Sequence, residues 1–198
     1  MENIIKEIEL RYKTTKPYSL EIQQTESDLE NPDFLGNLSR SAYCAYLQND
    51  ISFCNEILNI LIKIPFDGNY DKWTWIESGI YLKMYFCLNN NEYDDLKQLI
   101  DNQFNYSGLN ESTRKINLKV FNRRLLTGSM LQLRKNRVVQ QIEQKNIDLE
   151  FMYSLSYFSE LIFIYSMNKG NVDNPIKEDI AKIKNRLTEI ILFYKNNQ

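Results

Sequence analysis

Apolar residues recur at three- and four-residue intervals along most of the chain, which is the period of an amphipathic α-helix. In residues 33–48, for example, Leu35, Leu38, Ala42 and Ala45 lie on one stripe. No segment alternates apolar and polar residues between turn dipeptides, as a half-buried strand would. The sequence therefore predicts an all-α fold of about eight or nine helices.

The expected helices are separated by short breaks rich in Asn, Gly or Pro. Asp33 and Asp148 are expected to cap two of them, because a carboxylate accepts hydrogen bonds from the first free backbone N–H groups. The predicted ranges are Glu2–Lys13, Asp33–Gln48, Ile51–Lys63, Lys72–Leu88, Glu92–Gln103, Glu111–Leu126, Met130–Lys145, Asp148–Asn168 and Ile176–Asn196.

Short connections favour antiparallel pairing of consecutive helices. The expected pairs are Asp33–Lys63, Lys72–Gln103, Glu111–Lys145 and Asp148–Asn196. A chain of 198 residues is long enough to bury one core and is expected to form one domain, residues 1–198. Residues 1–32 are expected to be either a docked N-terminal cap or an arm.

The first two pairs have similar turns, in which Asn49 and Asn91 are 42 residues apart. The residues that carry the likeness are Ala42, Asn49-Asp50, Cys54 and Pro65 in the first pair and Asn91-Glu92-Tyr93 and Leu96 in the second. Over about residues 34–103 this pattern resembles tetratricopeptide-type helical hairpins. The resemblance implies a stack of helix pairs, tetratricopeptide-like or an irregular bundle, that holds another macromolecule.

The most apolar segment is Phe151–Met167, whose single charged residue is Glu160. Its 17 residues are few for a bilayer span, and Glu160 with four serines would make insertion costly. We expect a buried central helix and no membrane association. The first residues, 1–7, mix apolar and charged types too closely for a signal peptide.

The three cysteines, Cys44, Cys54 and Cys87, are widely spaced and odd in number. Reduced, buried thiols are expected, and with them a cytoplasmic location. Trp73 and Trp75 are two residues apart and cannot share a helical face. We expect both to pack between helices; the alternative is that one lies in the core and the other, partly exposed, anchors an interface.

Charge is distributed unevenly. Residues 112–141 contain eight basic side chains and no acidic one, whereas the rest of the chain has 16 basic and 26 acidic residues, a net of about −10. The five basic residues that fall on shared helical faces are the candidate partner-binding residues: Lys115, Lys119, Arg123, Arg134 and Arg137.

Three interpretations of this basic window remain open. Its cations are neutralised within the molecule, by residues such as Asp94, Glu143 or Glu150; or they bind an acidic protein surface; or they bind nucleic acid. The third ranks below the second because the overall pI is about 5.4 and an acidic surface repels phosphate.

The sequence lacks the residues that most catalytic and metal sites use. It has no histidine, no C-x-x-C pair and no glycine-rich phosphate loop, so we predict no catalytic residue, no metal and no cofactor. The expected function is non-catalytic protein binding. A basic toxin docking on the acidic remainder would make the chain an immunity or inhibitor protein. The alternative is nucleic-acid binding through residues 114–137.

Overall fold

The computed structural model describes residues 6–8, 10–11, 28–64, 69–104 and 129–197. Within these ranges every regular element is a helix, which confirms the all-α prediction. The described elements are η1 (Asp28–Glu30), α2 (Pro32–Leu47), α3 (Ile51–Leu61), α4 (Tyr70–Asn89), α5 (Tyr93–Phe104), α7 (Ser129–Glu143), α8 (Ile147–Met167) and α9 (Asn174–Asn196). The helix predicted over Glu111–Leu126 lies outside the described residues.

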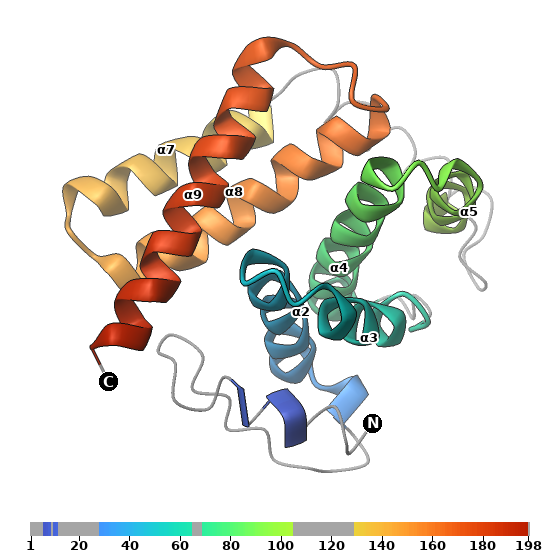
Figure 1. Ribbon diagram of the computed structural model, residues 1–198, viewed down its shortest axis with the longest axis horizontal. Helices are drawn as coiled ribbons and strands as arrows, with labels where there is room; N and C mark the ends of the chain where they lie inside the picture. Colours follow the sequence, from blue (N-terminus) through green and yellow to red (C-terminus); the bar gives the residue numbers. More distant parts are fainter. Residues whose placement is uncertain (1–5, 9, 12–27, 65–68, 105–128, 198) are drawn as a thin grey trace.

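The helices form two groups that meet at α8 (Figure 1). α2 packs on α3 and α4, and α4 packs in turn on α5 and α8. On the other side α8 contacts both α7 and α9. The predicted pairing of α8 with α9 is therefore confirmed. α7 and α8 form a further hairpin that the sequence did not predict.

Three hairpins close through the same kind of turn. In each, the residue after the last helical turn has positive φ, and the next backbone N–H donates to the carbonyl five residues earlier at 2.8 to 3.1 Å. This is the Schellman closure, and in these three hairpins the next helix begins two residues after the positive-φ residue. The positive-φ residues are Asn49 (62°), Asn91 (61°) and Lys145 (54°).

Asparagine provides the side-chain caps of the described helices. Asn31 accepts a hydrogen bond from the N–H of Asp33 at 2.9 Å, and Asn146 accepts one from the N–H of Leu149 at 3.1 Å. The predicted caps, Asp33 and Asp148, are instead first-turn residues. Their charge still favours the positive end of the helix dipole, but the capping position lies two residues earlier.

The core is built around α8, whose residues 151–167 are mostly buried as predicted. Aromatic rings join it to the first group of helices. Phe158 lies 6.2 Å from Tyr46 of α2, and Phe163 lies 4.1 Å from Tyr81 of α4, between ring centroids. None of the helices in the described ranges is long and apolar enough to cross a membrane.

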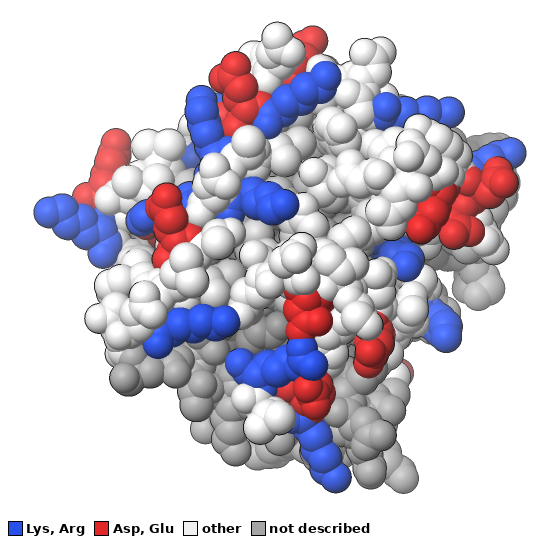
Figure 2. Space-filling view, viewed as in Figure 1, with Lys and Arg blue, Asp and Glu red and all other residues white. Residues whose placement is uncertain are grey.

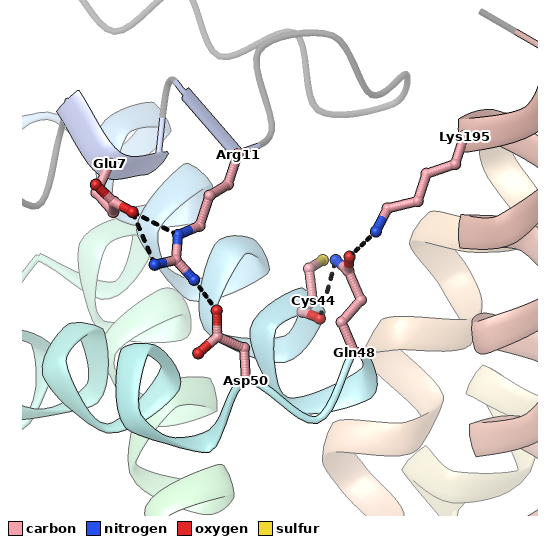
Figure 3. Close-up of polar contacts among 6 residues, drawn as sticks. All are labelled: Glu7, Arg11, Cys44, Gln48, Asp50 and Lys195. Atoms are coloured by element: carbon pink, nitrogen blue, oxygen red, sulfur yellow. Dashed lines mark hydrogen bonds and ion pairs between the residues drawn. The ribbon is translucent and has the colours of Figure 1, made fainter.

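Both ends of the described chain reach the turn between α2 and α3 (Figure 3). Arg11 forms ion pairs with Glu7, at 2.7 Å, and with Asp50 in the turn. From the opposite side, Lys195 near the end of α9 donates a hydrogen bond to Gln48. Ile8 is fully buried, so this part of the N-terminal segment is docked against the core.

Candidate functional site

The structure describes two of the five candidate partner-binding residues. Lys115, Lys119 and Arg123 lie outside the described residues. Arg134 and Arg137 lie on α7 and share a face, as predicted, and that face is turned toward α8. Arg134 Nε is 3.4 Å from the carboxylate of Glu160, and the guanidinium of Arg137 lies 5.7 Å from the ring centroid of Tyr153.

The third described cation of the basic window, Lys135, contacts α9. Its ammonium donates a 2.6 Å hydrogen bond to Asp179, whose same oxygen accepts another 2.6 Å bond from the hydroxyl of Tyr157. Partial burial works against ionisation of Asp179, but these hydrogen bonds outweigh it and lower the pKa of the carboxyl. Within the described residues, α7 is thus tied to its neighbours through its basic side chains.

The carboxylates that meet these cations differ from those named in the sequence analysis. Glu160 and Asp179 replace Glu143, Glu150 and Asp94 as the acidic neighbours. Glu150 is instead bound by Arg186 of α9. The residues of α8 and α9 that face α7 are set by tertiary packing, which helical periodicity alone does not fix.

A cavity of about 120 Å³ lies where α2, α4, α7 and α8 meet. α2, α4 and α8 each contribute side chains spaced three or four residues apart, the spacing that places them on one face, and α7 contributes one residue. The residues used below are Ser39, Arg40 and Tyr43 of α2, Thr74, Trp75, Glu77 and Ser78 of α4, Arg134 of α7, and Met152, Leu155, Ser156, Ser159 and Glu160 of α8.

The inner wall of the cavity is a chain of hydroxyl groups that links three helices. Tyr43 donates a 2.9 Å hydrogen bond to the backbone carbonyl of Ser78, and the Ser78 hydroxyl lies 3.1 Å from that of Ser159. Burial raises the pKa of Tyr43 well above its usual range. Tyr43 is therefore a neutral hydrogen-bonding group and not a base.

Two arginines and two glutamates also line the cavity. Glu160 is only 2% exposed and pairs with Arg134. The guanidinium of Arg40 lies over the ring of Trp75, 5.1 Å from its centroid, a cation–π arrangement. The formal charges of the lining therefore balance.

Sequence reasoning did not identify this cavity, although it noted two of its signals. Glu160 and the serines were counted only as obstacles to membrane insertion, yet Ser156, Ser159 and Glu160 share the face of α8 that lines the cavity. Trp73 is buried, whereas Trp75 is partly exposed at the cavity. A charge buried in an apolar helix has to be paired or hydrogen-bonded, so Glu160 was a signal that polar groups lie next to this face.

The three cysteines are poorly suited to act as nucleophiles in this fold. All three cysteines are free and buried, as predicted, and burial raises the pKa of Cys54 to about 12 and that of Cys87 to about 11. Among the described residues no cluster of three or more Cys, Asp or Glu could hold a metal ion.

The surface contains an acidic stretch at the beginning of α5. Glu92, Asp94 and Asp95 are exposed there, and Figure 2 shows acidic side chains gathered over this helix. The contrast with α7 is clear, because the described cations of that helix contact groups of the same molecule.

The fold and the cavity together define an all-α protein of packed helical hairpins, with a cavity lined by apolar groups, hydroxyl groups and charges that balance in sign. The chain belongs to a family of unknown function, DUF6707, whose model matches residues 1–191. No curated protein and no solved structure matches the chain.

Proposed function

We propose that this chain is a non-catalytic protein-binding module of the helical-hairpin type, as the tetratricopeptide resemblance implies. The tight Schellman turns support this proposal. Helices joined by such short connections present a preformed surface, so little conformational entropy is lost when a partner binds. The buried, high-pKa thiols fit a reducing cytoplasmic location.

The partner that best fits the described surface is a basic protein. The observation that carries this choice is the exposed acidic stretch of α5, Glu92 with Asp94 and Asp95, set against an α7 whose described cations are engaged within the molecule. Opposite charge on a partner would accelerate encounter and select against acidic competitors. A basic toxin is one such partner, and the chain would then be its immunity or inhibitor protein.

The proposal is tested by reversing the charges of the acidic stretch of α5 in one variant and those of the basic window in another. One variant carries Glu92→Lys, Asp94→Lys and Asp95→Lys, and the matched control carries Lys115→Glu, Lys119→Glu and Arg123→Glu. Each is co-expressed with the protein encoded by the adjacent gene, and co-purification is measured together with the melting temperature. We expect the α5 variant to lose the partner with an unchanged melting temperature, and the control to retain it.

Two results would contradict the proposal. Loss of the partner only in the 115/119/123 variant would place the interface on the basic window. Salt-dependent binding of the wild-type chain to mixed DNA and RNA, abolished by the same substitutions, would support the nucleic-acid alternative.

A further inference from the structure

The cavity between α2, α4, α7 and α8 is larger than packing defects usually are. Protein interiors contain few voids bigger than a water molecule. A volume of about 120 Å³ corresponds to roughly four water molecules at liquid density. Because a void of about 150 Å³ accommodates benzene, this one suits an organic molecule of about five or six non-hydrogen atoms.

The lining changes from exposed to buried along the cavity. Thr74 is exposed and Trp75 partly so, which places the opening at the first turns of α4. Ser39 and Glu160 are each only 2% exposed and form the inner end. A ligand entering past Thr74 would therefore leave water and meet an interior in which hydroxyl and charged groups stand among apolar side chains.

The charges of the lining limit what that ligand can be. Arg40 and Arg134 contribute two positive charges, and Glu77 and Glu160 contribute two negative ones. A phosphate or a dicarboxylate would meet both carboxylates, and a polyamine or divalent cation would meet both guanidinium groups. A molecule that carries one charge of each sign meets a complementary group at either end.

The Arg134–Glu160 pair offers the best anchoring point. Its 3.4 Å separation is longer than the roughly 2.7–2.9 Å of a charge-assisted hydrogen bond, and the buried Nε of Arg134 makes no hydrogen bond within the described residues. We propose that the cavity binds a small zwitterion of the α-amino acid class, whose carboxylate accepts hydrogen bonds from Arg134 and whose ammonium donates to Glu160. Met152 and Leu155 then contact its short aliphatic side chain.

The two tryptophans of the chain make a direct binding assay possible. Trp73 does not line the cavity and Trp75 does, so Trp73→Phe leaves one tryptophan, at the site. Glycine, L-alanine and L-serine are titrated while Trp75 fluorescence is recorded, and calorimetry on the wild-type chain repeats the titration. L-Lactate lacks the ammonium group and isopropylamine the carboxylate. Glycerol and inorganic phosphate represent uncharged and anionic ligands.

We expect a saturable response to at least one zwitterion and none to the four comparison compounds. Glu160→Gln and Arg134→Gln should each weaken binding by about tenfold or more. The exposed acid–base pair of α9, whose separation of 3.5 Å is close to that of the Arg134–Glu160 pair, supplies the controls Glu178→Gln and Lys182→Gln, and both should bind as wild type. Ser156→Leu fills the cavity without touching its charges and should abolish binding in a folded protein.

Several outcomes would overturn the proposal. The first is that no zwitterion gives a saturable response up to about 10 mM. The second is that L-lactate or isopropylamine gives an equal response, and the third is that only glycerol or phosphate gives one. Undiminished binding by Ser156→Leu would also overturn it, because that result places the ligand elsewhere. Melting temperatures of every variant, with and without ligand, separate lost binding from lost folding.

Discussion

Arg186 of α9 holds the buried carboxylate of Glu150 in α8 through two parallel hydrogen bonds. The bonds run from Nε to Oε1 at 2.5 Å and from Nη2 to Oε2 at 3.0 Å. The Glu150 side chain is 4% exposed, and this planar two-point contact raises the pKa of Arg186 far above its usual range. The pair joins the last two helices, α8 and α9.

Arg186→Ala should therefore destabilise the protein by about 2–3 kcal/mol, because it leaves the Glu150 carboxylate buried without its partner. This destabilisation is smaller than that expected for breaking a fully buried ion pair, because the Arg186 side chain is 42% exposed. Urea unfolding at neutral pH measures it. Glu189→Ala removes the other, exposed partner of Arg186 and should change the free energy of unfolding by less than about 0.5 kcal/mol. Equal effects of the two substitutions would contradict the role given to Glu150.

The hairpin turns depend on the conformation of one residue. Asn91 has φ of 61°, a region where most side chains are strained, whereas its neighbour Asn90 has φ of −90°. Asn91→Val should cost about 1–2 kcal/mol, while Asn91→Gly should be neutral or mildly stabilising. Thermal unfolding provides the measurement.

Asn90→Val is the matched control for this turn. It makes the same chemical change at an exposed neighbouring position where φ is allowed, so it should cost much less than Asn91→Val. If both valine variants were equally destabilised, side-chain hydrogen bonding and not backbone conformation would explain the choice of asparagine.

The positions of the helices could be predicted because their signals are local. The helix predicted over Ile51–Lys63 is observed as Ile51–Leu61, and that predicted over Lys72–Leu88 as Tyr70–Asn89. Apolar periodicity and polar breaks fix such limits to within about two residues. The choice between Asn31 and Asp33 as a cap was harder, since both types favour that position and only the backbone conformation decides between them.

The neighbours of each helix, and with them the cavity, could not be predicted in the same way. Periodicity shows that Arg134 and Arg137 share a face, but it does not show that this face meets α8. Similarly, it marks Glu160 as unusual without showing that Arg134 and the hydroxyls of Ser78 and Ser159 lie nearby. These relationships join residues far apart in sequence, which local patterns do not encode.

The Asp179 carboxylate should make stability depend on acid pH. Its pKa in the folded protein is below the unfolded value of about 3.9, so ionised Asp179 stabilises the fold above that value and the contribution is lost as pH falls through the folded pKa. Asp179→Asn should cost about 1–2 kcal/mol near pH 7, and the difference from wild type should shrink below about pH 4. Urea unfolding over a pH series measures this. The exposed neighbour Glu178→Gln should show no such trend, and a cost of Asp179→Asn that is independent of pH would rule out the ion-pair explanation.

Gly79 lets α4 approach α3 closely, and this contact can be tested by a double-mutant cycle. A Cβ atom at this position would lie 2.8 Å from Cδ1 and 3.2 Å from Cβ of the fully buried Leu61. Alanine favours a helix over glycine by about 1 kcal/mol, but overpacking costs about 1–3 kcal/mol, so Gly79→Ala should be destabilising overall by about 1 kcal/mol.

Asn59→Ala, on the exposed face of α3, is the control. It also raises helix propensity and should be slightly stabilising. Leu61→Ala alone leaves a cavity, yet combined with Gly79→Ala it should cost less than the sum of the two single substitutions, because the added methyl group occupies part of the vacated space. If the changes in the free energy of unfolding, measured by urea unfolding, were strictly additive, α3 and α4 could separate at this point, and Gly79 would not be needed for their contact.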